Sequence, residues 1–488
     1  MRLSEILEKC EYTCKSEIND AEISDVIYDS RKVVPGCVFV CLVGASSDGH
    51  AYAADAVLKG AAAIIAEREM DLPDGCVPII VENSRQALSY ISAAFFRYPA
   101  DELTTIALTG TKGKTTISFM IKDILEKAGK KAGIIGTMGV FTDKRHIETH
   151  NTTPESYEIQ KYLREMADEG CKYAVMEVSS QALMVGRTAG IVFDFGLFSN
   201  ISPDHIGENE HKDYGEYLRC KKILFSQCRQ GLFNIDDKHA EYMMEDATCS
   251  IHTYGFRPEA GLRAAEVHYL RDGGFIGIKM RTEGTVADEF LVGMPGKFTA
   301  YNAMAAIGIT FLCGIDTLPM KEALHDVLVT GRMENVRISD KFTLLIDYAH
   351  NAMSMESILT TMRDYNPKRM VSLFGCGGNR SKLRRFEMGE ISGRLADLSI
   401  LTADNSRFED VNDIIADILT GMHKTNGEYV VIPDRKEAIK YSIQNAREGD
   451  IILLLGKGHE DYQEIKGERY PFDERVVIKD ILEEIGWQ

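Results

Sequence analysis

The feature that most constrains the fold of this chain is a glycine-containing stretch between an apolar run and a helix-like run. The apolar run Thr104–Leu108 predicts a strand, residues 110–116 read GTKGKTT, and the run Thr115–Ala128 predicts a helix. A loop that leaves a strand and begins a helix points several backbone N–H groups at one spot, where the helix dipole also favours negative charge. This arrangement predicts a binding site for the phosphates of ATP.

The polar residues of this loop suit that role chemically. Glycine lets the backbone approach the phosphates, Lys114 reaches the terminal phosphates, and the Thr115 hydroxyl completes the coordination of Mg²⁺. The strict pattern has a glycine five positions before Gly113, whereas this chain has Leu108, so the loop is a shortened variant. A ligand-free turn is the alternative, but such turns rarely end in G-K-T-T. The residues predicted to bind nucleotide are Gly110, Thr111, Lys112, Gly113, Lys114, Thr115 and Thr116.

The length of the chain predicts more than one domain. Its 488 residues exceed the ~250–300 residues at which a single hydrophobic core stops growing. Pro99 and Asp101 interrupt the pattern before the glycine loop, and Gly331 and Arg332 mark a second change. We therefore expect an α/β protein with domains at residues 1–100, 101–331 and 332–488.

Strand-like apolar runs alternate with helix-like segments along most of the chain. Such alternation requires mainly parallel sheets that are covered by helices on both faces. The predicted strands besides the one before the loop are Cys37–Val43, Ala61–Ala66, Val77–Val81, Tyr173–Val178, Phe193–Phe198, Phe342–Ile346, Met370–Phe374, Leu398–Leu401, Tyr429–Ile432 and Ile451–Leu455; two early helices are predicted at His50–Lys59 and Arg85–Phe96.

Composition excludes several classes of partner. A net charge of −18 opposes non-specific binding of nucleic acid, which rewards clustered Lys and Arg. The N-terminus lacks the apolar core of a signal peptide, and no window approaches the ~20 apolar residues of a membrane span. The 11 cysteines contain no C-x-x-C pair, which argues against a disulfide framework or a zinc site and predicts buried thiols. We expect a cytoplasmic monomer whose partners are small molecules, with no nucleic acid and no membrane.

Ordered motifs give the chain a resemblance to a known family. The glycine loop is followed by NTTP at 151–154, MEVSSQAL at 176–183, NISPDH at 200–205 and YLRCKKILF at 217–225. Taken together, these motifs resemble those of the Mur ligases. Three C-terminal motifs, FGCGGNR at 374–380, DNSR at 404–407 and GKGHEDYQ at 456–463, are similar to those of the members that add the third residue of the peptidoglycan stem peptide.

The resemblance implies a fold and a reaction. The implied fold has an N-terminal α/β domain that binds a uridine nucleotide, a central phosphate-loop ATPase-like domain and a C-terminal Rossmann-like domain. ATP would phosphorylate the terminal carboxylate of UDP-N-acetylmuramoyl-L-alanyl-D-glutamate, and an amino acid would attack the acyl phosphate. Activation is needed because a free carboxylate could only expel oxide. The implied cofactors are ATP and Mg²⁺.

The resemblance also implies catalytic residues. Glu177 and His205 match a second magnesium site of the family, and Lys221 matches a lysine that the family carries as a carbamate. A carbamate reverses the charge of the lysine and makes it an oxygen ligand for metal. Seen singly, these residues could be an acid at a strand end, a capping histidine and a solvated lysine. The implied catalytic residues are Lys114, Lys221, Glu177 and His205, and the implied metal ligands are Thr115, Glu177, His205 and Lys221.

Further positions match the family's contacts to nucleotide and to the sugar substrate. Asn302 matches the adenine-side asparagine, while Arg332 and Asp347 match residues at the phosphates and ribose. The residues matched to the uridine and muramoyl-dipeptide contacts are Tyr28, Ser30, Ala45, Ser46, Ser47, Asn151, Thr152, Thr153, Ser179 and Arg187. The first five of these could also simply form turns.

The DNSR motif bears on the third amino acid. Members that add meso-diaminopimelate carry D-N-P-R, whose arginine pairs with the far carboxylate of the diamino acid. Arg407 keeps that arginine, which grips a carboxylate bidentately and would repel the ammonium of lysine, whereas Ser406 replaces the proline. The residues matched to the acceptor are Arg380, Asp404, Asn405, Ser406, Arg407, Gly456 and Glu460, with Glu460 placed to receive an ammonium.

Several alternatives stay open at this point. The chain could be a paralogue that uses L-lysine or another amino acid as acceptor. It could be a ligase similar to folylpolyglutamate synthetase, although the N-terminal segment and GKGHE count against this. A non-catalytic protein that binds a nucleotide sugar is a third possibility. It conflicts with the joint presence of Lys114, Thr115, Glu177, His205 and Lys221, because a binding module does not need metal ligands.

Overall fold

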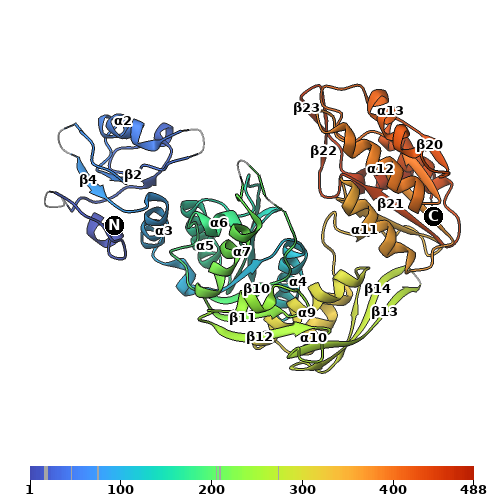
Figure 1. The fold of residues 1–488 in the computed structure, drawn as a ribbon, viewed down its shortest axis with the longest axis horizontal. Helices are drawn as coiled ribbons and strands as arrows, with labels where there is room; N and C mark the ends of the chain where they lie inside the picture. The colour runs from blue at the N-terminus through green and yellow to red at the C-terminus, as the bar shows by residue number, and fades with distance from the viewer. Residues whose placement is uncertain are drawn as a thin grey trace. The chain divides into compact units, whose positions relative to one another are not determined.

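The structure is a computed structural model that describes residues 1–15, 20–44, 47–73, 76–204, 206–207, 210–272 and 274–487 (Figure 1). The chain forms two compact units, and each is described by itself. The first unit comprises Met1–Arg263, Gly284–Val286 and Met304–Met320, and the second comprises Ala264–Glu283, Ala287–Ala303 and Lys321–Gln488.

The N-terminal part of the first unit is a small parallel α/β layer. Its four strands follow the order β1-β2-β3-β4, and every neighbouring pair is parallel. Hydrophobic clusters cover both faces of this sheet, as a parallel sheet requires. The strands are β1 (Val26–Ile27), β2 (Val38–Val40), β3 (Ala63–Ala66) and β4 (Val77–Ile80), and the helices are α1 (Leu3–Ile6), α2 (Ala53–Leu58) and α3 (Ser84–Phe95).

The central part of the first unit is built on a larger sheet. Consecutive neighbours follow the order β12-β11-β10-β5-β9-β6-β7-β8, and only the β6-β7 and β7-β8 pairs in this run are antiparallel. The strands are β5 (Thr104–Thr109), β6 (Ala132–Gly136), β7 (Gly139–Phe141), β8 (His146–Ile147), β9 (Tyr173–Glu177), β10 (Phe193–Phe198), β11 (Cys228–Asn234) and β12 (Ser250–Gly255), and the helices are α4 (Lys114–Lys127), α5 (Ser156–Asp168), α6 (Ser180–Met184), α7 (Tyr214–Lys222) and α8 (Ala240–Met244).

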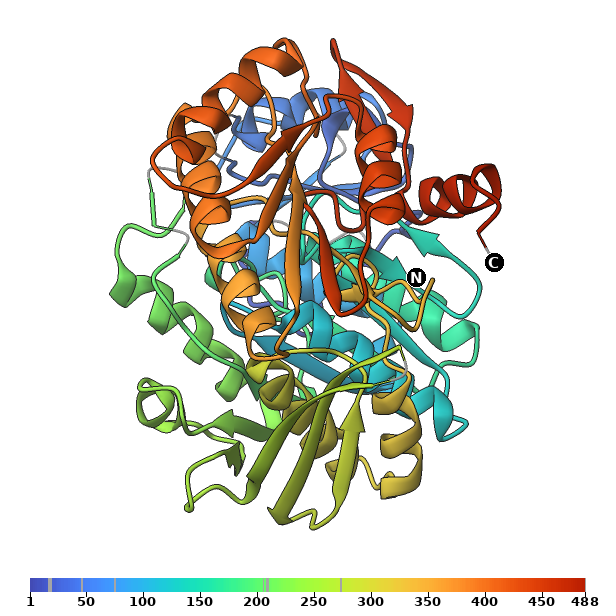
Figure 2. The ribbon, with the colours of Figure 1, turned by 90° about the vertical axis from the view of Figure 1, so that its right-hand side faces the viewer.

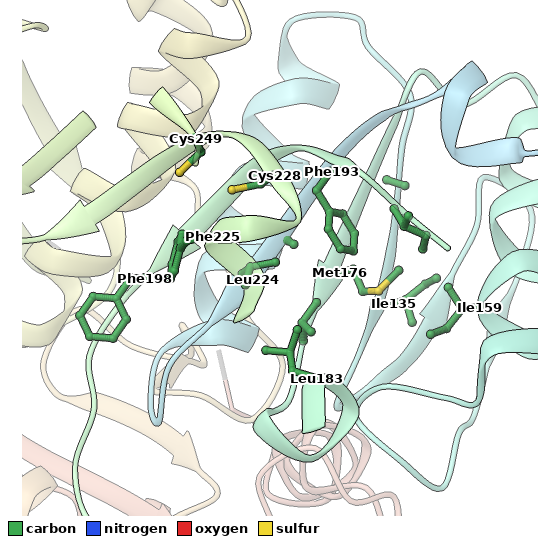
Figure 3. Packing of buried hydrophobic residues seen from close by; sticks show 14 of the residues in the cluster. Ile135, Ile159, Met176, Leu183, Phe193, Phe198, Leu224, Phe225, Cys228 and Cys249 are labelled. Atoms are coloured by element: carbon green, nitrogen blue, oxygen red, sulfur yellow. The ribbon is translucent and has the colours of Figure 1, made fainter. Parts of the chain in front are cut away.

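A tightly packed apolar core supports one face of this sheet. Figure 3 shows Met176 of β9 and Phe193 of β10 among side chains from α5, α6 and the segment before β11. All of the cluster's core residues are buried. This packing fixes the carboxyl ends of β5, β9 and β10, and in open α/β sheets ligands bind beyond such ends.

Antiparallel strands lead from the first unit into the second. β13 (Leu262–Asp272) begins in the first unit, and β14 (Phe275–Gly284) pairs antiparallel with β15 (Glu289–Val292). The helices α9 (Lys297–Leu312) and α10 (Thr317–His325) follow. None of these three strands was predicted, although β13 and β14 are long.

The second unit contains a six-stranded sheet in the order β16-β17-β21-β18-β19-β20, parallel except for β16. One hydrophobic cluster lies between this sheet and α11–α13, and another lies between the sheet and α14–α15, so helices flank both faces (Figure 2). The elements are β16 (Glu334–Asn335), β17 (Thr343–Asp347), β18 (Arg369–Phe374), β19 (Leu398–Leu401), β20 (Tyr429–Val431), β21 (Asp450–Leu455), α11 (Ala352–Arg363), α12 (Lys382–Leu395), α13 (Val411–Met422), α14 (Arg435–Gln444), α15 (Glu474–Glu484) and the hairpin β22 (Tyr462–Ile465) and β23 (Glu468–Pro471).

Two further expectations concern cysteines and membrane spans. Each of the eleven cysteines lies outside any disulfide, and eight of them are buried, with Cys14, Cys76 and Cys313 half-buried. Among the helices of the described residues, none combines the length and the apolar character that a membrane crossing requires.

Candidate active site

The glycine loop is locked in place by the strand beside it. Gly110 has φ of +148°, and a Cβ there would lie 2.0 Å from the Ser199 Oγ. Gly113, at the N-terminus of α4, has φ of +89°, a conformation that favours glycine. The Lys112 N–H donates to the Asn200 Oδ1 over 3.0 Å, and the Asn200 amide donates back to the Lys112 carbonyl over 2.9 Å. The loop is therefore preformed at the carboxyl end of β5.

Two lysines converge on one carbonyl of this loop. The Lys114 Nζ donates to the Gly110 carbonyl over 2.8 Å, and the Lys221 Nζ donates to the same oxygen over 3.0 Å. Burial lowers the pKa of Lys114. Burial, followed by repulsion from Lys114, lowers the pKa of Lys221 well below its ordinary value. Burial and repulsion therefore bias Lys221 toward its neutral amine, which leaves Lys114 as the cation that can attract an anion at this point.

Oxygen ligands lie next to the lysines. The Thr115 hydroxyl donates to the Glu177 Oε2 over 3.1 Å, and the Thr137 hydroxyl donates to the same oxygen over 3.0 Å. Glu177 is buried at the end of β9. A carboxylate beside a hydroxyl suits the hard ligand preference of Mg²⁺. His205 lies outside the described residues, and within those residues no group of three or more His, Cys, Asp and Glu could hold a metal.

The residues matched to the muramoyl dipeptide surround the same point. The Thr153 hydroxyl donates to the Glu177 carbonyl over 2.9 Å and accepts from the Ser179 N–H over 3.0 Å. Arg187 donates to the Thr153 carbonyl and pairs with Glu155, which also binds Arg85 of α3. Arg187 is thus held by an internal carboxylate. Asn151 is exposed, and the Thr152 hydroxyl lies 3.1 Å from that of Thr137.

The lysines and the residues matched to the dipeptide line one cavity of about 280 Å³. Gly110, Lys114 and Lys221 line it together with all five positions matched to the dipeptide. Sequence reasoning missed six lining residues, namely His150, Ser180, Gln181, Glu210, His211 and Tyr217. A signal existed for Tyr217, which begins the YLRCKKILF motif and whose hydroxyl lies 3.0 Å from that of Thr111.

The residues matched to uridine lie at turns of the N-terminal layer. Asp29 caps the short helical turn Ser30–Lys32. The Tyr28 hydroxyl donates to the Glu158 carboxylate over 2.7 Å, which connects this layer to α5. Ser47 is exposed, whereas Ala45 and Ser46 lie outside the described residues.

The second unit holds the other residues matched to nucleotide. Asp347, at the end of β17, accepts from the Met333 and Ala349 N–H groups, each over 2.8 Å. Burial raises the pKa of Asp347, and the nearby Arg332 opposes that shift. Arg332 lies over the ring of Tyr348, 5.2 Å from its centroid. Asn302 is a half-buried residue of α9.

The DNSR and GKGHEDYQ motifs meet in a charged network. The buried Lys457 Nζ donates to the Asn405 Oδ1 over 3.1 Å and to the Glu460 Oε2 over 3.0 Å. The Asn405 amide donates to the same Glu460 oxygen over 2.9 Å. Arg407 pairs with Glu464 at 3.2 Å. Lys457 and Glu464 were not singled out from the sequence, although both lie within or next to the GKGHEDYQ motif.

The remaining residues matched to the acceptor flank this network. Asp404 and Ser406 are buried, Arg380 is exposed, and a Cβ on Gly456 would lie 3.4 Å from the Asp404 carboxylate. Arg385, also missed, ties the FGCGGNR loop to the DNSR segment. It binds Glu409 with both Nη atoms and lowers the pKa of that carboxyl to about 2.

Comparison with known proteins assigns the chain to a class. The "Mur ligase family, catalytic domain" model matches residues 22–97, the "Mur ligase middle domain" matches 108–310, and the "Mur ligase, glutamate ligase domain" matches 331–458. The chain belongs to the Mur ligase family.

Relatives within this family span nearly the whole chain. A protein of Caldanaerobacter subterraneus subsp. tengcongensis named UDP-N-acetylmuramoyl-L-alanyl-D-glutamate–2,6-diaminopimelate ligase is 39% identical over 485 residues, covering 99% of each chain. A protein of the same name from Clostridium botulinum is 40% identical over 492 residues, covering 99% of this chain and 100% of that one. A solved structure with that name matches with a TM-score of 0.75 and 28% identity, covering 98% and 100% of the two chains.

These matches confirm several predictions. The resemblance to the Mur ligases is confirmed, as is the α/β fold with N-terminal, central and C-terminal domains. The class of enzyme is confirmed as well: the chain is an ATP-dependent ligase that forms an amide bond. Relatives aligned over 99% of the chain also weigh against a folylpolyglutamate synthetase.

Proposed function

We propose that this enzyme adds meso-2,6-diaminopimelate to UDP-N-acetylmuramoyl-L-alanyl-D-glutamate, with consumption of ATP, in peptidoglycan synthesis. The observation that carries the proposal is the convergence of Lys114 and Lys221 on the Gly110 carbonyl, inside a cavity lined by the positions matched to the dipeptide. The names of the relatives and the retention of Arg407 support the choice of acceptor.

The geometry suits formation of an acyl phosphate. The dipeptide carboxylate attacks the γ-phosphorus of ATP, the bond from that phosphorus to the bridging oxygen breaks, and ADP leaves. The amine of the acceptor then attacks the acyl carbon, phosphate leaves, and the amine loses a proton. Lys114 and the N-terminal N–H groups of α4 bind the phosphates, because two anions approach each other only where cations and dipoles offset their repulsion.

The residues present fit Mg²⁺. Thr115, Glu177, His205 and a carbamylated Lys221 would hold it, and when bound it would neutralise charge on the phosphates. A carbamate forms from a neutral amine, and the lowered pKa of Lys221 favours that neutral form. Its new negative charge would also relieve the repulsion between the two lysines.

We further propose roles for the three domains. Residues 1–100 bind the uridine nucleotide through Tyr28, Ser30 and residues 45–47. Residues 101–331 bind ATP and the dipeptide, with Asn302 on the adenine side. Residues 332–488 contribute Arg332 and Asp347 to the nucleotide and Arg380, Asp404–Arg407, Gly456 and Glu460 to the acceptor. The enzyme acts as a cytoplasmic monomer on small molecules.

A phosphate-release assay with an amino-acid screen tests this function. With UDP-muramoyl-dipeptide, Mg²⁺ and ATP, the enzyme should release phosphate only after an amino acid is added. Meso-diaminopimelate should exceed L-lysine by at least about tenfold in kcat/KM, because Arg407 repels the lysine ammonium. Reactions without the dipeptide serve as controls. Equal turnover with L-lysine would show that the acceptor is wrong while the ligase chemistry stands.

A further inference from the structure

The β22–β23 hairpin, labelled in Figure 1, carries Glu464, whose carboxylate contacts Arg407 of the DNSR motif. Lys466 and Gly467, the two residues between the strands, have φ of +53° and +82°. Positive φ at both positions is typical of the tight two-residue turns that fix the register of a hairpin. That register places Glu464 opposite Arg469, on the strand that contacts Arg407.

Glu464 contacts Arg407 through both main chain and side chain. The Arg407 N–H donates to the Glu464 carbonyl over 2.9 Å, and the Arg407 Nε lies 3.2 Å from the Glu464 Oε2. The Arg407 Nη1 donates to the Gly378 carbonyl over 3.0 Å. The backbone contact therefore fixes the two residues side by side, whereas a single long bond joins their side chains.

The Arg407–Glu464 ion pair is weak enough for a ligand to insert between the two side chains. Hydrogen bonds between an arginine and a carboxylate are strongest when they are bidentate and when nitrogen and oxygen lie about 2.7–2.9 Å apart. The Arg407–Glu464 contact is monodentate and longer, and the two side chains are 24% and 23% exposed. Both charges can therefore be reached from solvent and can accept better partners.

The negative charge of the neighbouring Glu460 is already compensated by hydrogen bonds within the protein. The Glu460 Oε2 accepts from both the Asn405 amide and the buried Lys457. The Asn405 Oδ1 accepts from Lys457 and from the Glu464 N–H, the latter over 3.0 Å. Asn405 thus holds Glu460 and Glu464 on its two ends, and of these two carboxylates Glu464 is the one whose partner is solvent-accessible.

We propose that Glu464 adds to acceptor specificity by binding the far ammonium group, beside Glu460, while Arg407 binds the adjacent carboxylate. The inference rests on the proposed function, because the far end of a diaminodicarboxylic acid is a zwitterionic head group with both charges on one carbon. Such a head group inserts between Arg407 and Glu464 and satisfies both. An acceptor with only one of the two charges leaves a partly desolvated partner unpaired, which is the more costly state.

Three acceptors distinguish recognition of the far ammonium by Glu464 from recognition of the far carboxylate by Arg407. Meso-diaminopimelate has both far charges, L-2-aminopimelate lacks the far ammonium, and L-lysine lacks the far carboxylate. The wild type should prefer meso-diaminopimelate over L-2-aminopimelate. In Glu464→Gln this preference, as a ratio of kcat/KM values, should fall about tenfold, because the amide cannot pair with an ammonium as a carboxylate does. The KM for ATP should stay unchanged.

Glu468→Gln is the matched control, since it makes the same change on the same hairpin at an exposed position. Its ratio should equal that of the wild type. Equal loss of activity with both acceptors in Glu464→Gln would mean that Glu464 only holds the hairpin, and equal gain would mean that it only competes for Arg407. Either outcome overturns the inference. A wild type that uses none of the three acceptors would instead overturn the proposed function.

Discussion

At the scale of single residues, Lys221 occupies a position that is costly for a charged side chain. It is 2% exposed, lies within a cavity that also contains Lys114, and shares the Gly110 carbonyl with it. A permanent ammonium there would be costly, so its chemistry in the working enzyme differs from that of a simple cation.

Replacing Lys221 tests this chemistry. Lys221→Ala should lower kcat by at least about a hundredfold in the phosphate-release assay, because a group that stabilises charge on the transferred phosphoryl is lost. Lys221→Arg should be equally impaired, since a guanidinium keeps the charge but does not form a carbamate. Added bicarbonate should rescue neither variant.

Lys222→Ala is the control for that pair of variants. Lys222 adjoins Lys221 on α7 but pairs with Asp246, outside the cavity, and its loss should leave activity nearly unchanged. Substantial activity in Lys221→Arg would contradict the carbamate and favour an ammonium role.

The residues predicted from the sequence lie close in the chain to the residues that they act with. Those that were missed have partners far away in the chain. The glycine loop was predictable because its strand, loop and helix are contiguous. Glu464 was not, because its significance depends on Arg407, which lies 57 positions earlier in the chain. The same holds for Arg385 and Glu409, whose pairing joins helix α12 to the segment that follows the DNSR motif.

At the scale of elements, most of the predicted strands lie where both faces of a sheet are buried, although the predicted edge strand β20 is largely exposed. Phe193–Phe198 and Leu398–Leu401 match β10 and β19 in full, and β5, β9 and β21 differ from prediction by one residue at one end. Continuous apolar runs identify such strands. The strands β13 and β14 escaped because they are partly exposed and carry charged residues, so no apolar run marks them.

A buried ion pair joins two helices of the second unit. Its arginine also contacts the chain just before the two acceptor motifs. Arg435 of α14 and Glu474 of α15 are both fully buried and lie 2.8 Å apart. Arg435 also donates to the carbonyls of Ala403 and Leu455, the residues just before the DNSR and GKGHEDYQ motifs. The Glu474 Oε2 has no hydrogen-bond partner within the described part of the chain.

Breaking this pair should destabilise the protein strongly. Arg435→Met should lower the free energy of unfolding by about 3–5 kcal/mol, because Glu474 would be left as an uncompensated buried charge. The double variant Arg435→Met with Glu474→Met should recover most of that loss, since two apolar side chains leave no buried charge. Urea denaturation followed by circular dichroism measures both changes.

Lys436→Met provides the reference on the same helix. Lys436 is more exposed and pairs with Glu484, so its replacement should change stability by no more than about 0.5–1 kcal/mol. If the double variant were as unstable as Arg435→Met, the contacts of Arg435 to the two carbonyls, not the ion pair, would carry the stability.

At the scale of the whole molecule, the C-terminal region has the core of an independent domain. Its six-stranded sheet is covered on one face by α11–α13 and on the other by α14 and α15, all from residues after 331. Several contacts come from before this boundary: Ile276 of β14 packs into the cluster on the α11–α13 face, and Arg271 of β13 donates to Thr343 and to the carbonyls of Gly449 and Asp450.

A fragment of residues 332–488 should therefore fold alone. We expect a single cooperative urea transition, since both faces of its sheet are buried by its own helices. A longer fragment, 264–488, should unfold at a higher urea concentration because it regains Arg271. If only the longer fragment unfolded cooperatively, the domain boundary would lie before residue 332.

The two lysines at the Gly110 carbonyl have a consequence for how stable this enzyme can be. Two ammonium groups side by side would destabilise the folded chain, because like charges repel strongly where water is excluded. The carbamate proposed for Lys221 would replace that repulsion with attraction to Lys114. The modification would therefore stabilise the folded enzyme before any substrate binds.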